Sequence, residues 1–273
     1  DNKYVNELYI TIVKEGQGSS IANPQMFFRG IIPTLESRSR WNYLEKARDE
    51  LNETMDLLLT KLHDYGARKL GLNTKNDVVY SETINFLSKL TNLRDENLPL
   101  PDIALSDYLT SQEVTFGFNA MEVRDKDGKR RFGAILTVKE YREMSADSID
   151  LLLQVEAEFI VTQCMDFINH KKALKDYKDQ AEIYELSEET DLPKRIGLKD
   201  IMESNNDSKV DFGEQQINIF VLGDTVKSLE SNVQKVVRGL NKLGIIAVRE
   251  DVMFSEAYWS QLPGNFEFLR RLK

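Results

Sequence analysis

Cysteine and histidine are scarce in this sequence, which has one cysteine and two histidines in 273 residues. A single cysteine excludes a framework of intramolecular disulfides and slightly favours a reducing compartment. Cys164 lies in an apolar stretch with no neighbouring base, so we interpret it as a small buried hydrophobic residue rather than a nucleophile. His63 and His170 have no second histidine or cysteine beside them, and we predict that neither is a metal ligand or a catalyst.

Basic residues are fewer than acidic ones, 36 against 45, and the formal net charge is −9. This balance argues against general binding to nucleic acid or to anionic membranes. A local basic patch is compatible with it, and Lys129–Arg131 is the short cluster on which a nucleic-acid interpretation would rest. The sequence has neither an apolar run of about 18 residues nor the pattern of a signal peptide.

Two glycine-containing stretches come near to phosphate-binding motifs, and each lacks an essential part. Gly16–Ile21 follows a predicted strand, but the third glycine of a dinucleotide fingerprint is missing and Pro24 stands where a helix should begin. Gly66–Gly71 has the glycine spacing of a P-loop, but Leu72 and Asn73 replace the lysine and hydroxyl that bind phosphate and magnesium. We therefore predict no nucleotide-binding, catalytic or metal-binding residue in this chain.

Hydrophobic periodicity predicts the secondary structure of the first part of the chain. Leu8 to Val13 alternate as in a strand, and Trp41 to Tyr65 have helical spacing up to a stop at Gly66. A second helix is expected from Ser81. Leu98–Pro101 breaks the pattern, and we predict a boundary between two lobes there.

A β-rich region follows this boundary. A tight turn or bulge is expected between Val114–Phe116 and Met121–Val123, and Asp125–Gly128 has the composition of a hairpin turn before a strand that begins near Arg131. Another strand is predicted at Phe159–Phe167. A long helix is predicted from His170.

The end of the chain has the clearest pattern. A strand at Ile217–Val221, a helix at Leu229–Leu243 and a strand at Ile245–Val248 predict a right-handed crossover, with Val236 and Leu240 pointing into the sheet beside Ile246. From these elements we expect an α+β fold of mixed β-sheets with helices packed mainly on one face. The β-α-β order suggests that the C-terminal part is ferredoxin-like.

Tyr258–Phe266 stands out as a run that fits neither helix nor strand. Pro263 fixes φ and Gly264 permits a positive φ, so the chain is expected to turn sharply. Trp259 and Phe266 flank this turn, and such aromatic side chains are costly to leave in water. We predict that the turn contacts another domain through the following residues: Trp259, Gln261, Leu262, Pro263, Gly264, Asn265 and Phe266.

The same run resembles the Trp-x-Gln-Leu-Pro-Gly-Asn segment of the CagE/TrbE/VirB family, the large ATPases of bacterial type IV secretion systems. Other short segments resemble this family in the same order. They are Glu7–Thr11, Tyr80–Glu82 with Phe86–Leu87, Pro99–Pro101 with Leu105–Leu109, Gly133–Ile135, Lys139–Tyr141, Thr162–Gln163, Gly223–Asp224 and Val248–Asp251. The resemblance covers nearly the whole chain.

The resemblance implies an N-terminal assembly domain that docks a motor to the inner-membrane base of a secretion system and helps it to oligomerise. From the break at Leu98–Pro101 we predict residues 1–97 as a smaller α+β lobe and 98–257 as a larger one, and the resemblance implies 258–273 as a linker toward a C-terminal motor domain. The whole protein is then expected to use ATP and magnesium, at the cytoplasmic face of the bacterial inner membrane, with other secretion components as partners, peripheral contact with the membrane and no direct binding of nucleic acid.

A second class of function stays open at this point. The abundance of Asp and Glu is compatible with a free-standing carboxylate-based or metal-dependent enzyme, although protein surfaces supply such residues in any case.

Overall fold

The computed structural model describes residues 5–14, 33–140, 152, 154–168 and 212–265. The predicted helix from His170 and the glycine-containing loop Gly16–Ile21 lie outside these residues, as does Phe266. The elements of the first part are α2 (Pro33–Lys61), the 3₁₀ helix η1 (His63–Tyr65), β1 (Leu72–Lys75), β2 (Val78–Ser81), α3 (Glu82–Asn92) and α4 (Leu105–Tyr108). Those of the second part are β3 (Glu113–Phe116), β4 (Met121–Arg124), β5 (Arg130–Glu140), β6 (Phe159–Ile168), β7 (Phe212–Gly223), α9 (Val226–Lys242), β8 (Ile246–Arg249) and α10 (Phe254–Trp259).

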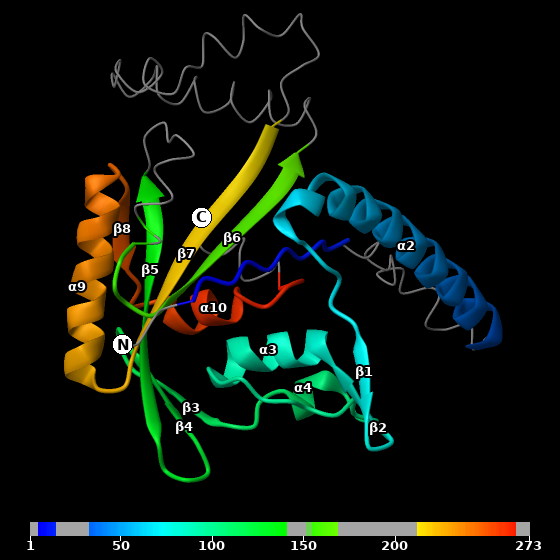
Figure 1. Cartoon of the computed structure of the whole chain (residues 1–273), viewed down its shortest axis with the longest axis horizontal. Coiled ribbons are helices and arrows are strands. Elements are labelled where there is room, and N and C mark those ends of the chain that lie inside the picture. Colours follow the sequence, from blue (N-terminus) through cyan, green and yellow to red (C-terminus); the bar gives the residue numbers. More distant parts are fainter. Residues whose placement is uncertain (1–4, 15–32, 141–151, 153, 169–211, 266–273) are drawn as a thin grey trace, which may run out of the picture.

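A six-stranded sheet forms the body of the molecule (Figure 1). Its strands run in the order β3-β4-β5-β7-β6, and β8 pairs with the C-terminal half of β5 on the side where β4 pairs with the N-terminal half. Every strand pairing among the described residues is antiparallel. The expectation of mixed parallel and antiparallel pairing is therefore corrected for this part of the chain.

The crossover predicted at the end of the chain is present. β7 and β8 are both antiparallel to β5, which lies between them, so they run parallel to each other and α9 connects them. Thr225 begins the helix with a capping box, in which its side chain accepts a hydrogen bond from the Ser228 amide and the Ser228 hydroxyl accepts one from the Thr225 amide.

The inner face of α9 buries Leu229, Val233, Val236 and Leu240 against strands β5 and β7. Val236 and Leu240 point into the core as expected, but their neighbour on β8 is not Ile246. Ile245 and Ala247 pack in this cluster, whereas Ile246 is exposed. Successive side chains of a strand point to opposite faces, so the predicted contact was wrong by one residue.

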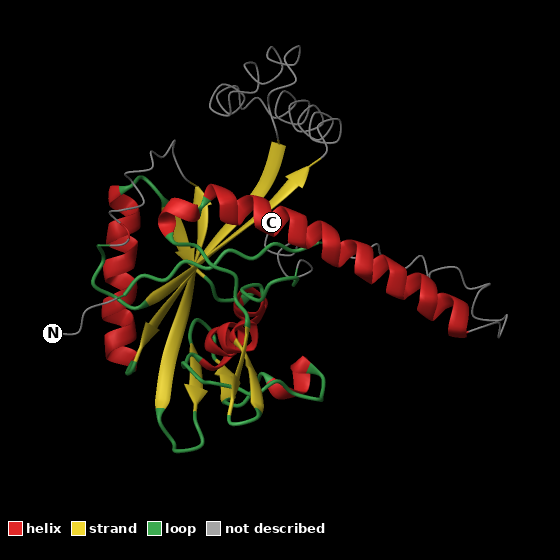
Figure 2. Ribbon diagram, turned by 45° about the vertical axis from the view of Figure 1, so that its right-hand side comes forward, coloured by secondary structure: helices red, strands yellow, loops and turns green. Residues whose placement is uncertain are grey.

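The opposite face of the sheet carries a second core. It contains Ile135 and Phe220 from the sheet, Phe254 and Tyr258 from α10, and Leu93 at the end of α3. Helices therefore pack on both faces, and the expectation that they cover mainly one face is wrong. Figure 2 shows the sheet with α9 on one side and the shorter helices on the other.

The α+β class is confirmed, because antiparallel sheets combine with separate helices. The order β8-β5-β7-β6 and the β7-α9-β8 crossover have the arrangement that the ferredoxin-like label describes. That label also requires a helix between β5 and β6, where residues 141–151 lie outside the described part, so it stays a prediction.

The N-terminal segment differs from its prediction. Residues 5–14 form no strand, and Leu8 is 87% exposed. The segment crosses α3 instead, where Tyr9 stacks on Phe86 with a centroid distance of 4.4 Å and the Lys89 ammonium donates to Glu7 at 2.8 Å. The predicted strand at Leu8–Val13 is therefore wrong, because alternating hydrophobicity does not supply the neighbouring strand edge that a β-strand requires.

The predicted helix at Trp41–Tyr65 is confirmed as α2 followed by η1, and Gly66 ends it at a φ of 67°. Both views show α2 projecting away from the sheet (Figures 1 and 2). The β1–β2 hairpin that follows was not predicted. Its turn residues Asn76 and Asp77 both have positive φ, a conformation that Asn and Asp tolerate, so a sequence signal was present there.

Three other expectations are confirmed. α3 begins after Ser81, whose side chain accepts a hydrogen bond from the Ile84 amide. The Asp125–Gly128 turn joins β4 to β5, and Gly117 and Ala120 close a tight turn between β3 and β4. The lobe boundaries at 97/98 and 257/258 stay predictions. Leu93 and Tyr258, which lie outside the larger predicted lobe, pack in one core with Phe220.

Candidate functional site

The turn that the sequence singled out begins as a helix. Phe254, Ala257 and Tyr258 occupy positions i, i+3 and i+4 of α10, and all three are buried against the sheet. Tyr258 and Trp259 are therefore helical, which corrects the view that the whole run fits neither helix nor strand. The sharp turn comes after them, where Gly264 adopts a φ of 91°.

Tyr258 ties this helix to α3. Its hydroxyl donates to the Thr91 carbonyl at 2.7 Å, and its ring meets Phe220 and Phe116 edge-on at centroid distances of 5.6 and 5.5 Å. Burial raises the pKa of the Tyr258 hydroxyl above its ordinary value, because the phenolate would be desolvated here. The side chain thus stays neutral and keeps its donor for the helix carbonyl.

Hydrogen bonds hold the turn to the same core. Ser260 accepts from the Asn218 side chain of β7 at 3.1 Å and donates to the Ala257 carbonyl at 2.7 Å. Gln261 donates from its amide side chain to the Tyr258 carbonyl at 3.0 Å, and Asn265 donates to the Trp259 carbonyl at 2.9 Å. The geometry of the turn is therefore set within this chain.

The structure brings six of the seven predicted contact residues together, and they differ in exposure. Gln261 is buried. Four are half-buried, namely Trp259, Leu262, Pro263 and Asn265, and Gly264 is exposed. Trp259 packs on Phe116 and Tyr258 at centroid distances of 6.4 and 4.9 Å. The outward part of the turn is accordingly short and centres on Leu262–Gly264.

The N-terminal segment also reaches this turn. A methyl carbon of Val13 lies 4.0 Å from the position that a Cβ would occupy on Gly264. Lys14 forms an ion pair with Glu50 of α2. The two ends of the described chain therefore meet at one place, which the sequence did not reveal because nothing in it pairs these segments.

A buried polar network near α3 was also missed. The Asn92 side chain donates to the Leu109 carbonyl at 2.7 Å and to the Ser88 hydroxyl at 2.8 Å, and it accepts from the Ser111 amide at 3.1 Å. This network fastens the segment after Leu98–Pro101 to the helix that carries the Tyr258 contact. The sequence gives no signal of this network, because Ser88 and Asn92 resemble ordinary polar residues of a helix.

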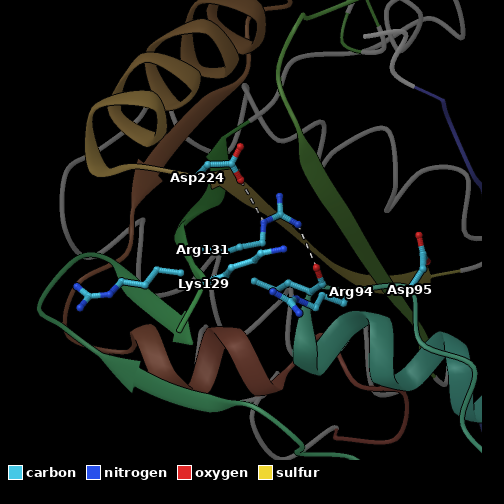
Figure 3. Close-up of a pocket in the computed structure, with 7 residues that line it drawn as sticks. Arg94, Asp95, Lys129, Arg131 and Asp224 are labelled. Carbon is cyan, nitrogen blue, oxygen red and sulfur yellow. Dashed lines mark hydrogen bonds and ion pairs between the residues drawn. The ribbon is translucent and has the colours of Figure 1, made fainter. Parts of the chain in front are cut away.

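A shallow hollow of about 500 Å³ gathers basic side chains at one end of the sheet (Figure 3). Its lining includes Arg94, Lys129, Arg130 and Arg131 together with acidic Asp95 and Asp224. The sequence had marked Lys129–Arg131, and the fold adds Arg94 from the end of α3.

Carboxylates pair with the three arginines of this hollow. Arg94 forms an ion pair with Asp125, Arg130 lies 3.4 Å from Glu122, and Arg131 pairs with Glu158 and lies 3.7 Å from Asp224. The Asp125 carboxyl has a lowered pKa, because the Lys129 amide and Arg94 favour its charged form more than burial opposes it. Such pairing reduces the positive potential that a polyanion would meet, so the hollow is a weak candidate for phosphate binding.

Residues of the carboxylate or metal alternative do not converge in the described part of the chain. No group of three or more His, Cys, Asp or Glu side chains there could hold a metal ion. Cys164 is half-buried in β6, and burial raises the pKa of its thiol, as expected for a residue without an activating base. Within the described ranges, no helix combines the length and hydrophobicity that a membrane crossing requires.

Fold and site together define an α+β domain with a structured aromatic turn at its C-terminal end. Residues 68–271 match a family described as the CagE, TrbE, VirB family, component of type IV transporter system. The chain belongs to this family.

Relatives agree with this assignment. The chain is 25% identical over 270 residues to the type IV secretion system protein virB4 of Bartonella henselae, covering 98% of the chain and 34% of the relative. It is 24% identical over 243 residues to protein virB4 of Agrobacterium fabrum, covering 87% of the chain and 30% of the relative. It is 20% identical over 271 residues to the type IV secretion system protein PtlC of Bordetella pertussis, covering 97% of the chain and 32% of the relative. The chain thus spans about a third of the length of these proteins.

Proposed function

We propose that this chain is the N-terminal assembly domain of a type IV secretion ATPase, and that it docks a C-terminal motor domain to the base of the secretion channel. The observation that supports this most is the Tyr258–Asn265 segment, which is fastened to α3 through Tyr258 and to β7 through Ser260. A C-terminal segment that is held rigidly transmits the movement of a following domain to the sheet. A flexible segment would not transmit it.

The whole protein would then take ATP and magnesium through P-loop residues of the motor and use them for substrate transport and for assembly of the pilus or channel, in conjugation or virulence. Its partners would be other secretion components and further copies of itself, at the cytoplasmic face of the bacterial inner membrane, with peripheral contact to the lipid. This assignment rests on family membership.

The docking role predicts a specific effect of a charge on that surface. Leu262→Asp should weaken co-purification of this domain with a separately expressed motor domain, and in the whole protein it should reduce substrate transport, because an aspartate is costly to desolvate at a contact. Val252→Asp is the matched control, since Val252 is exposed in the loop before α10. ATP hydrolysis and the melting temperature should remain near those of the parent. Unchanged co-purification and transport in the Leu262 variant would contradict the docking surface.

A second prediction is that the 273-residue chain alone binds no nucleotide. Phosphate binding requires a glycine-rich backbone nest, a lysine and a hydroxyl at fixed spacing. The Gly66–Asn73 stretch instead leads from the Gly66 cap into strand β1, with Leu72 and Asn73 as its first residues. Titration calorimetry with magnesium and ATP should show no saturable heat. Micromolar binding would require a nucleotide site within this domain and would contradict its purely structural role.

A further inference from the structure

Residues 5–14 form an N-terminal strap that joins three parts of the described chain. Tyr9 of the strap stacks on Phe86 of α3. Glu7 accepts a hydrogen bond from the Lys89 ammonium, about one helical turn further on, so the strap and α3 run antiparallel. The last residue of the strap forms an ion pair with α2. Figure 1 shows the strap in blue, with this end near α2.

Side chains rather than backbone groups hold the strap in place. In the part of the chain that the structure describes, no backbone–backbone hydrogen bond joins the strap to another element. The Tyr9 hydroxyl donates to Glu7 at 3.1 Å, and burial raises the pKa of this hydroxyl, so it keeps its proton. The Lys89 ammonium lowers the pKa of the Glu7 carboxyl, which therefore stays charged. Single contacts of these kinds are weak, so the strap belongs to the segments that open locally at low cost.

The strap and the C-terminal turn form one outward surface. Val13 of the strap meets Gly264, and neither covers the other, because Val13 is 39% exposed and Gly264 is exposed as well. Leu262 on the same turn is half-buried. Neither the strap residues 9–13 nor the turn residues 262–265 include a charged side chain. The surface is therefore uncharged, and it is built from both ends of the described chain.

We propose that the strap and the turn together receive the C-terminal motor domain, with Val13 beside Leu262–Gly264 in the contact; this proposal rests on the docking role proposed above. The uncharged surface fits an apolar patch on that domain, since it requires no charge to be desolvated. The chain covers 34% of the virB4 protein of Bartonella henselae, so most of such a protein lies outside the matched part. That remaining part is where the occupant of the surface lies.

The strap also links this contact to the two helices that it touches. A domain that binds the strap and the turn together strengthens their contact. By thermodynamic linkage, an attached strap strengthens the binding of that domain by the same factor. Because Lys14 pairs with Glu50 of α2, docking at the turn is transmitted to the helix that projects from the sheet (Figure 1).

Hydroxyl-radical footprinting tests the composite surface, because it measures the exposure of single side chains. Val13 should be modified roughly tenfold more slowly in the isolated whole protein than in the 273-residue chain, as expected when the undocked state is populated to about 10%. Leu8 should be modified equally in both, since it lies about 17 Å from Val13 along an extended segment. In the whole protein, Leu262→Asp should return the modification of Val13 to the rate of the 273-residue chain.

A variant of the strap tests the linkage. Tyr9→Ala removes the stack on Phe86, so in the whole protein the modification of Leu262 should rise roughly two- to tenfold, the factor that an aromatic pair contributes. In the 273-residue chain the same variant should leave the modification of Leu262 unchanged, because no motor domain is there to be released. Leu8→Ala is the matched control, since Leu8 is 87% exposed, and it should have no effect in either protein.

The outcomes separate this proposal from the docking role. If Leu262 is protected in the whole protein and Val13 is modified equally in both proteins, the strap lies outside the contact and only this proposal is overturned. If neither residue is protected, the docking role is overturned together with it. Protection of Val13 that rises with protein concentration would assign the surface to a second copy of the chain and would also overturn the proposal.

Discussion

Tyr258→Ala is expected to destabilise this domain by roughly 3–5 kcal/mol, the range of buried aromatic truncations. Tyr258 is 2% exposed, and its ring packs between the sheet residue Phe220 and Phe116 of β3. The substitution also leaves the Thr91 carbonyl of α3 without its donor. Chemical denaturation followed by circular dichroism measures the loss.

Two variants separate the causes of this effect. Tyr258→Phe keeps the ring and loses only the hydrogen bond, so it should cost about 1 kcal/mol, with more if the buried carbonyl stays unpaired. Trp259→Ala should cost less than Tyr258→Ala, because Trp259 is half-buried in this chain. If Trp259→Ala costs as much as Tyr258→Ala, Trp259 acts as a structural lock of this domain rather than as an anchor for another one.

Leu240→Ala is expected to destabilise the domain by roughly 2–5 kcal/mol, as buried leucine truncations do. Leu240 is 1% exposed and lies in the core between α9 and the sheet, and its carbonyl accepts from the Ile245 amide where the chain turns into β8. The lost side chain leaves a cavity at the end of the crossover, and the fixed hydrogen bond limits how far the helix can collapse into it.

Val226→Ala provides the matched control at the other end of α9. Val226 is exposed, so its truncation should change the free energy of unfolding by only about 0.5 kcal/mol or less. Melting curves of the two variants against the parent test the assignment of helix faces. Equal stability of Leu240→Ala and the parent would show that α9 does not pack as described.

The sequence predicted elements whose causes are local. Helix α9 was predicted because apolar residues recur at helical spacing along one face. The helix end at Gly66 was predicted because glycine adopts a positive φ without strain. The hairpin at Asp125–Gly128 follows from turn chemistry. A P-loop is also a local feature, because it requires residues of fixed type at fixed spacing. The sequence alone therefore shows that the glycine-containing stretches do not complete this motif.

The sequence did not allow us to predict contacts between segments that lie far apart along the chain. The sequence identifies Phe254 and Tyr258 as apolar, but it does not show that they pack on the second face of the sheet. Hydrophobic periodicity indicates which side of a helix is buried and gives no information about the element that it packs against. The residues that meet at the candidate site show the same limit. Tyr258 bonds to Thr91 and Ser260 bonds to Asn218, and no pattern in one segment encodes the other.

The sequence by itself determined the α+β class, the crossover at the end of the chain and the position of the turn at Pro263–Gly264, because each depends on backbone preferences and hydrophobic spacing within a few residues. Only the tertiary structure decided that the residues before this turn are a helix locked into the core, and that helices cover both sheet faces. These features depend on which surfaces meet, and burial of apolar area is not directional, so a local pattern cannot select among several partners.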